Sequence, residues 1–298
     1  MAALICGSLA FDTIMTFEGR FAEQILPDQL HILNVSFLVP SLRRDFGGCA
    51  GNIAYSLKLL GGNPVPMAML GSDGGDYLQR LQDLGIDTRH VGRVDETYTA
   101  QALIMTDRDN NQITAFHPGA MMLAHRARIT AESDLRLGII APDGRDAMIE
   151  HAAQFEAAGI PFVFDPGQGL PMFGGEELAR FIGQASWVTV NDYEGRMLCE
   201  RTGWSLAEIS RKVRGLAVTL GADGCDVWED GVATRVPPVQ AASMVDPTGC
   251  GDAWRGALLF GLEQGWPLAR CAALGNRLGA LKIAQRGPQN YQLDFEPA

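Results

Sequence analysis

The fold of this chain is decided by Asp246-Pro247-Thr248-Gly249-Cys250-Gly251-Asp252-Ala253-Trp254. This turn of small residues leads directly into the helix-compatible segment 255–262. Small residues allow backbone N–H groups to converge at a helix N-terminus, where the positive end of the helix dipole favours phosphate oxygens or a developing oxyanion. We therefore interpret Gly249, Cys250 and Gly251 as an anion-binding turn.

Asp252 lies in the first turn of the expected helix, beside this anion site. A carboxylate in that position can accept the proton of a hydroxyl group that attacks phosphorus. Asp252 is therefore our candidate general base. The alternative interpretation is that Asp and Gly only cap the helix, as they often do in proteins.

The length and composition indicate a large α/β protein. Of the 298 residues, 47% are hydrophobic, which is enough to bury a large core. The formal net charge of −11 argues against nucleic acid or an anionic membrane surface as a partner, because both need a basic patch. The six cysteines are scattered without CxxC pairs, and residues 1–15 lack the basic start of a signal peptide. We therefore expect a cytoplasmic protein with neither a zinc site nor a membrane span.

Strand-like apolar runs alternate with helix-like runs along most of the chain, which predicts a mostly parallel sheet. Two segments, 11–45 and 93–118, break this pattern with strand and turn signals, including a hairpin of 99–106 with 112–116. We expect these two segments to form a β-rich lid. The α/β core would then comprise residues 1–10, 46–92 and 119–298. The runs expected as core strands are 3–7, 64–70, 137–141, 161–165, 187–191 and 215–220.

Several common nucleotide and hydrolase motifs are absent from the sequence. It contains no GxxxxGK[ST], no GxGxxG after an expected strand, no HExxH and no GxSxG. The chain is therefore not a P-loop enzyme, and a dinucleotide-binding Rossmann fold is disfavoured. In open α/β sheets, ligands bind at the carboxyl ends of the strands, and several polar residues are expected there.

Gly47-Gly48-Cys49-Ala50-Gly51-Asn52 precedes an expected helix and forms a plausible sugar-binding turn. Paired glycines permit close approach of the backbone to a ligand, and the Asn52 amide can both donate to and accept from hydroxyl groups. Asp12 follows the first strand, where its carboxylate can accept two hydrogen bonds from a diol. The alternatives are local ones, with Asn52 capping its helix and Asp12 stabilising a turn.

Together, the two glycine-containing motifs resemble the paired signatures of the PfkB, or ribokinase-like, carbohydrate and nucleoside kinases. The resemblance extends from Gly7 to Gln289 and is strongest to bacterial adenosine or broad-specificity nucleoside kinases. It implies a three-layer α/β/α fold with a mostly parallel central sheet and a smaller β-rich lid. One departure is Cys250, where the family usually has Ala or Gly, but Cys is small enough to keep the turn.

The resemblance also implies roles for individual residues. In the family, the matching motifs hold the sugar hydroxyls, form the anion hole and supply the base. Carried over to this sequence, the sugar-binding residues are Asp12, Gly47, Gly48 and Asn52, the anion hole is Gly249, Cys250 and Gly251, and the base is Asp252.

Further positions resemble the family's nucleotide and metal sites. Asn191 and Glu194 match an NxxE motif that helps place Mg²⁺ and its waters near the triphosphate of ATP. Asp246 and Thr248 would contribute to a K⁺ site together with a loop that begins at Gly287. The residues implied near the nucleotide are Asn191, Thr219, Gly221, Gly224 and Asn276.

The implied reaction is transfer of the γ-phosphoryl group of ATP to a primary hydroxyl. The apolar lid, which includes Phe17, Phe21, Phe37 and Phe116, favours a flat nucleoside such as adenosine or other purine nucleosides over a free sugar. Gln101 is a candidate to contact the edge of the base. The alternative is that these apolar side chains pack the lid against the sheet or against a second subunit in a homodimer.

Two other functions stay open. The first is a sugar or sugar-phosphate kinase, for which Arg43 and Arg44 offer positive charge near the expected acceptor site. The second is a non-catalytic nucleoside-binding protein with the same fold. It is disfavoured because Asp252, the anion-binding turn and Glu194 are all present.

Overall fold

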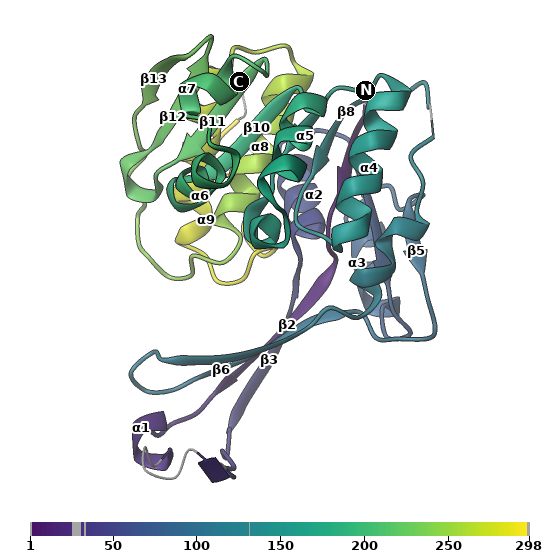
Figure 1. Cartoon of the computed structure of the whole chain (residues 1–298). Helices are drawn as coiled ribbons and strands as arrows, with labels where there is room; N and C mark the ends of the chain where they lie inside the picture. Colours follow the sequence, from purple (N-terminus) through teal and green to yellow (C-terminus); the bar gives the residue numbers. More distant parts are fainter. Residues whose placement is uncertain (1, 26–30, 33, 131, 297–298) are drawn as a thin grey trace.

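A computed structural model describes residues 2–25, 31–32, 34–130 and 132–296 (Figure 1). Within these residues, the strands of a large sheet are β1 (Ala2–Cys6), β4 (Pro64–Leu70), β5 (Val91–Arg93), β8 (Leu135–Ile140), β9 (Phe162–Phe164), β10 (Trp187–Asn191), β11 (Gly215–Thr219), β12 (Cys225–Glu229) and β13 (Val232–Val236). A small sheet contains β2 (Ala10–Thr16), β3 (Ser41–Gly47), β6 (Ala100–Thr106) and β7 (Gln112–His117).

The helices are α1 (Phe21–Gln24), α2 (Cys49–Leu59), α3 (Gly75–Asp83), α4 (Arg145–Ala158), α5 (Gly175–Gln184), α6 (Asp192–Thr202), α7 (Leu206–Ser210), α8 (Cys250–Glu263) and α9 (Leu268–Ile283). Short 3₁₀ segments are η2 (Gly119–Arg126), η3 (Gly167–Met172) and η4 (Gly221–Asp223). Among the described residues, no helix combines the length and the apolar character needed to cross a membrane.

The large sheet has the order β13-β12-β11-β10-β9-β8-β1-β4-β5 and is parallel from β5 to β11. Both of its faces are covered, because alternate residues of β1 enter two different cores: Ala3 and Ile5 one, Leu4 and Cys6 the other. Helices α2, α3, α8 and α9 contribute to the first core, and α4, α5, α6 and α7 to the second. The predicted three-layer fold is therefore confirmed.

The order of the strands explains where a ligand site can form. From β1, the chain continues to β4 and β5 on one side, and later to β8 and its successors on the other side. Such a switch point opens a crevice at the carboxyl ends of the neighbouring strands. Ser8 follows β1 at this point, and its hydroxyl and carbonyl oxygens accept hydrogen bonds from Cys49 N (3.2 Å) and Ala50 N (3.0 Å). The crevice therefore also receives the N-terminus of α2.

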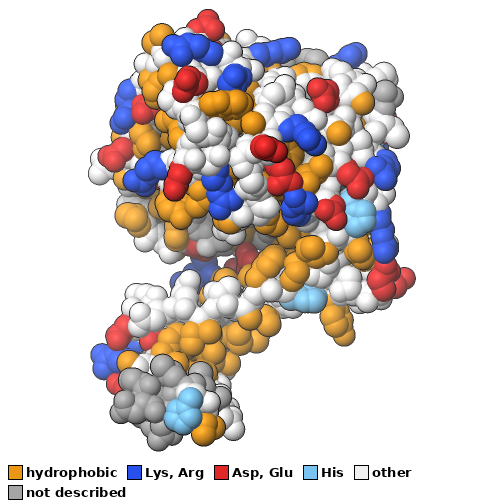
Figure 2. Space-filling view, in the orientation of Figure 1, with side chains coloured by type: hydrophobic (Ala, Val, Ile, Leu, Met, Phe, Trp, Pro, Cys, Tyr) orange, Lys and Arg blue, Asp and Glu red, His pale blue; other side chains and the backbone are white. Residues whose placement is uncertain are grey.

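The small sheet has the order β3-β2-β6-β7 and projects from the larger body as an arm (Figure 1). Figure 2 shows hydrophobic side chains along this arm, and a recess between the arm and the body. Near the far end, the rings of Phe17, Phe21 and Phe37 pack against one another, with centroids 5.0–5.9 Å apart. These three aromatic side chains therefore pack within the arm itself.

The large sheet differs from the expectation at both of its edges. Strands β12 and β13 form an antiparallel hairpin that the sequence pattern does not indicate. Polar and charged residues within this hairpin, such as Asp226 and Arg235, obscure the apolar alternation that would indicate strands. At the other edge, β5 pairs with β4, so residues 91–93 belong to the large sheet.

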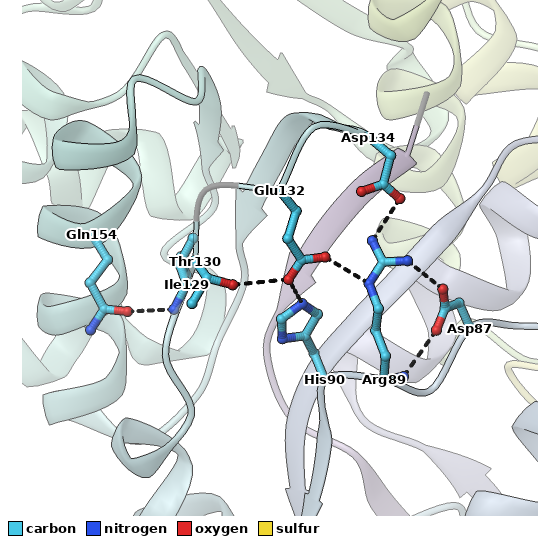
Figure 3. Close-up of polar contacts among 8 residues, drawn as sticks. All are labelled: Asp87, Arg89, His90, Ile129, Thr130, Glu132, Asp134 and Gln154. Carbon is cyan, nitrogen blue, oxygen red and sulfur yellow. Dashed lines mark hydrogen bonds and ion pairs between the residues drawn. The ribbon is translucent and has the colours of Figure 1, made fainter.

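Polar contacts also join the two loops that precede β5 and β8, at the amino ends of these strands (Figure 3). Arg89 lies between the carboxylates of Asp87 (2.6 Å), Glu132 (2.9 Å) and Asp134 (2.8 Å). His90 also reaches Glu132, at 2.8 Å. These contacts hold the loops before β5 and β8 together, far from the carboxyl ends of the strands.

Helices α2 and α8 approach closely at one glycine. A side-chain carbon at Gly256 would lie 2.5 Å from Ser56 Cβ and 3.0 Å from the Leu57 backbone nitrogen. Asn52 lies one turn before Ser56 in α2, and Asp252 lies one turn before Gly256 in α8. The glycine therefore allows the N-terminal turns of the two helices to meet.

We expect Gly256→Ala to destabilise the protein by about 1–3 kcal/mol, because the added methyl group forces two packed helices apart. The measurement is chemical or thermal unfolding of the variant. Gly183→Ala is the matched control, since Gly183 is an exposed residue of α5 with open space around it. That change should be neutral or stabilising by up to about 1 kcal/mol. Equal stability of the two variants would contradict the role assigned to Gly256.

Candidate active site

Asn52 and Asp252 meet at the carboxyl end of the large sheet. Asn52 Nδ2 donates a hydrogen bond of 2.8 Å to Asp252 Oδ2, across 200 residues of sequence. Burial raises the pKa of Asp252 to about 6, and Asp165 adds to this effect, whereas the Asn52 hydrogen bond and Arg255 oppose it. A half-buried carboxyl group with this pKa is ionised at neutral pH and is a stronger base than an ordinary aspartate.

The turn before Asp252 has the geometry of an anion site. Gly249 is the N-cap of α8 with a φ of 78°, and a side-chain carbon there would lie 2.6 Å from Pro288 Cβ. Only glycine adopts this conformation readily and also fits the space. Within the described residues, the N–H groups of Gly249 and Gly251 have no backbone acceptor and are available to an anion, whereas Ala253 N donates to Gly249 O at 2.9 Å.

Cys250 fits this turn as a neutral side chain. Its backbone N–H donates to Pro247 O at 3.2 Å, and its Sγ lies 3.9 Å from Asp246 O. Burial raises the pKa of the Cys250 thiol to about 11, so the thiol stays protonated at neutral pH. Because the thiolate is the reactive form, Cys250 is not an activated nucleophile.

Asp12 faces the same place from the small sheet. It lies opposite Asp45 in the β2–β3 ladder. Burial raises the pKa of Asp12 to about 6, with further contributions from the negative charges of Asp45, Asp252 and Asp246. The structure therefore brings Asp12, Asn52 and Asp252 together.

The two glycines between Asp12 and Asn52 leave room for these contacts. A side-chain carbon at Gly47 would collide with the Asp12 carboxylate. Gly48 has a φ of 84°, and a side-chain carbon there would lie 2.6 Å from Ser8 O. Both positions therefore require glycine, as the motif suggests.

A buried ion pair below Asp252 is not indicated by the sequence analysis. Arg255 Nε and Nη2 donate to the two carboxylate oxygens of Asp165 at 2.6 and 2.8 Å, and both side chains are almost fully buried. Arg255 Nη1 also donates to Gly251 O at 3.2 Å. This fork-like pairing fixes the first turn of α8 to the end of β9. The nearby sequence signal is Arg255 itself, a charged residue one turn after Asp252.

A second set of unpredicted residues orients Asn52. Gln289 Nε2 donates to Asn52 Oδ1 at 3.0 Å and to the Tyr77 hydroxyl at 2.8 Å, and that hydroxyl donates to Gly47 O at 2.6 Å. With its oxygen accepting from Gln289, the Asn52 amide can turn only its NH₂ group toward Asp252. The only sequence signal for Gln289 is its place just after Gly287-Pro288, where the resemblance ends.

Asn191 and Glu194 form a capping box at the start of α6. Asn191 Oδ1 accepts from Glu194 N at 2.7 Å, and Glu194 Oε2 accepts from Asn191 N at 2.8 Å. Glu194 Oε2 also lies 3.9 Å from Arg255 Nη2. Burial and the neighbouring Asp165 raise the pKa of Glu194, while Arg255 opposes the rise. The expected motif is thus connected to α8, the helix that carries Asp252, through Arg255.

The other expected nucleotide residues lie at the end of β11, in the η4 turn that follows it, and in the middle of α9. Thr219 ends β11, and Gly221 and Gly224 flank the η4 turn with φ values of 58° and 89°. Asn276 is held by Trp254 Nε1, which donates to its Oδ1 at 3.1 Å, and by Pro237 O, which accepts from its Nδ2 at 2.8 Å.

Gln101 and Phe116 lie on different faces of the small sheet. Phe116 pairs with Ala102, which pairs with Asp12, so Phe116 and Asp12 share a face. Gln101 points to the other face, where its Nε2 donates to Thr13 Oγ1 at 2.6 Å. Phe116 is therefore on the side of Asp12 with 53% of its surface exposed, whereas Gln101 is not on that side.

Comparison with known proteins places this geometry in a family. A model of the pfkB family of carbohydrate kinases matches residues 19–294. The structure of Burkholderia thailandensis nucleoside kinase with inosine is 51% identical, with a TM-score of 0.87 over 97% of this chain and 93% of that chain. The same enzyme with ADP-inosine is 52% identical, with a TM-score of 0.85 over 98% and 92% of the two chains.

The nucleoside kinase of Methanocaldococcus jannaschii is also similar, at 29% identity over 97% of this chain and 93% of that protein. The family match covers nearly the whole chain, including both glycine-containing motifs that frame the site. This chain therefore belongs to the pfkB family of carbohydrate kinases.

Proposed function

We propose that this protein is an ATP-dependent nucleoside kinase that phosphorylates the 5′-hydroxyl of adenosine or of a range of purine nucleosides. The observation that carries the proposal is the hydrogen bond between Asn52 and Asp252, opposite Asp12 and beside the anion-binding turn. The similar Burkholderia thailandensis enzyme has been solved with inosine and with ADP-inosine, which supports a nucleoside acceptor and an adenine nucleotide donor.

In the proposed mechanism, Asp252 accepts the proton of the 5′-hydroxyl as that oxygen attacks phosphorus. Its raised pKa of about 6 leaves it ionised at pH 7 and increases its basicity. Asp12 and Asn52 would hold the ribose hydroxyls. The N–H groups at 249–251 would stabilise the charge on the transferred group, while Arg255 keeps their turn in place.

The small sheet is proposed as the lid over the acceptor. Phe116 shares the face of Asp12, so its ring can pack against the base of a nucleoside bound through its ribose. Closure of the lid would exclude water from the transferred phosphoryl group and limit hydrolysis of ATP. The opposite face exposes Leu42, Leu103 and Ile113, which is the surface we propose for a homodimer.

Mg²⁺ is proposed to arrive with the nucleotide. Within the described part of the chain, no group of three or more His, Cys, Asp or Glu side chains is placed to hold a metal ion alone. Glu194 fits a supporting role through water, since Mg²⁺ in kinases is bound by phosphates, water and few carboxylates. When bound, the ion neutralises phosphate charge. Our proposed contacts to the nucleotide remain Asn191, Thr219, Gly221, Gly224 and Asn276.

The alternative of a phosphorylated sugar as acceptor is less well supported. Arg43 forms ion pairs with Asp45 (3.0 Å) and Asp246 (3.8 Å). Arg44 lies over the Phe11 ring at 3.4 Å and pairs with Asp73 at 3.4 Å. Both guanidinium groups are thus engaged within the protein, so neither is poised for a second phosphate.

An acceptor screen tests the proposed function. We expect ATP consumption with purine nucleosides and Mg²⁺, at least about tenfold faster than with ribose or fructose at equal concentration, because a base adds about 1–3 kcal/mol of apolar contact. Chelation of Mg²⁺ should abolish the reaction. Faster turnover of a free sugar would favour a sugar kinase, and nucleoside binding without turnover would favour a binding protein.

Asp252→Asn should reduce kcat by about 10²–10⁴-fold, because the amide cannot accept the proton. Nucleoside binding, measured by calorimetry, should be largely retained. Asp192→Asn is the matched control, since Asp192 is an exposed first-turn acid of α6 that pairs with Arg196. Its kcat should equal that of the wild type. Near-normal turnover by the Asp252 variant would refute its role as base.

The decrease of kcat/KM at low pH should reflect protonation of Asp252 and Asp12. Both have a pKa raised to about 6, so kcat/KM should be constant near pH 7–8 and fall as the pH drops below about 6. Asn52→Leu removes the hydrogen bond that lowers the pKa of Asp252. The pH at which the remaining activity of this variant falls to half should therefore be higher than in the wild type. Rates measured at constant ionic strength that stay flat down to pH 5 would contradict this assignment.

A further inference from the structure

The ammonium group of Lys282 lies beneath the anion-binding turn. The sequence contains three lysines, and this one, near the end of α9, is fully buried with 0% exposure. Its Nζ donates to two main-chain carbonyl oxygens, Asp246 O at 2.7 Å and Gln285 O at 3.2 Å. A buried ammonium is costly unless its charge is compensated by such acceptors. Lys282 therefore connects two loops, the one that contains Asp246 and the one that follows α9.

The two loops that Lys282 bridges are joined by several other bonds. Val245 N and Asp246 N donate to Ile283 O at 2.9 and 3.1 Å. The Asp246 carboxylate accepts from Thr248 N and from Gly287 N, both at 2.9 Å. The loop after α9 thus holds the segment from Val245 to Thr248, which leads directly into Gly249. Lys282 supplies the positive charge at the centre of this arrangement.

The potassium site suggested by the resemblance does not fit this geometry. K⁺ binds where oxygen atoms, often backbone carbonyls, replace its hydration shell. Here the carbonyl of Asp246 already accepts from the Lys282 ammonium, and both oxygens of the Asp246 carboxylate already accept from backbone N–H groups. A potassium ion at these oxygens would also be repelled by the fixed ammonium beside it.

We propose that Lys282 is a built-in substitute for a monovalent cation: it positions the 246–249 turn, so that the anion site is complete without K⁺. Lys282 is a positioning residue, since it acts through the backbone of Asp246 and touches no substrate. The proposal rests on the proposed kinase function for its kinetic consequences. Its structural consequence, a turn held by an internal cation, is independent of the reaction.

The first test is a cation series on the unmodified protein. Phosphorylation rates in KCl, NH₄Cl, NaCl and tetramethylammonium chloride, at equal ionic strength, should agree within about twofold. Activation of the wild type by K⁺ or NH₄⁺ by about tenfold or more would overturn the proposal. An absence of turnover in all four salts would instead count against the kinase function, and the unfolding test described below would then decide the role of Lys282.

The second test replaces the internal cation. Lys282→Met should lower kcat by about 10²-fold, as expected when a catalytic turn is misplaced by about 1 Å. Nucleoside KM should change little, because the Asp12 and Asn52 contacts remain. K⁺ or NH₄⁺ should restore part of the activity, and tetramethylammonium, which is too large, should not. Lys58→Met is the matched control. Lys58 lies in the last turn of α2, near Gly85 and the amino end of β4, and so at the opposite end of α2 from the site.

Thermal unfolding gives a readout that does not need activity. The melting temperature of the wild type should be the same in KCl and in tetramethylammonium chloride, whereas K⁺ should raise that of Lys282→Met. If the Met variant does not fold, the same measurements are made on Lys282→Gln, which keeps a hydrogen-bond donor but lacks the charge. Full activity without any cation response in either folded variant would overturn the proposal.

Discussion

The close packing of α2 against α8 is the constraint on which the rest of the site depends. Gly256 leaves no side chain between the helices, so their axes approach near Ser56. One turn earlier, Asn52 and Asp252 come within hydrogen-bond distance. The proposed base and the proposed hydroxyl-binding amide are thereby placed at the meeting point of two helix N-termini, where the dipoles of both helices favour negative charge.

The segment after α9 holds this meeting point in place. Gln289 fixes the orientation of the Asn52 amide, Pro288 packs on Gly249, and Lys282 binds the carbonyl of Asp246. Each contact involves a different part of the site, but all three come from eight consecutive residues, 282–289. This short segment therefore acts as a common support for both glycine-containing motifs, 47–52 and 246–252.

The raised pKa values in the site result from the partial burial of several carboxyl groups close to one another. Burial raises the pKa of both Asp12 and Asp252 to about 6, and the negative charge of Asp252 adds to the rise for Asp12. Arg255, paired with Asp165, keeps the rise for Asp252 moderate. A carboxylate with this pKa is ionised under neutral conditions and is still able to hold a proton briefly, as the proposed proton transfer from an alcohol requires.

The sequence by itself determined the alternation of strands and helices, the two glycine-containing turns and the residue types within them. These features are local, because each depends on backbone conformations and side-chain periodicities of neighbouring residues. Only the tertiary structure decided which side chains meet: Gln289 with Asn52, Arg255 with Asp165, and Lys282 with Asp246. It also placed Gln101 on the face away from Asp12. Such contacts join residues 36 to 237 positions apart, and they depend on strand order and helix packing, which no local pattern encodes.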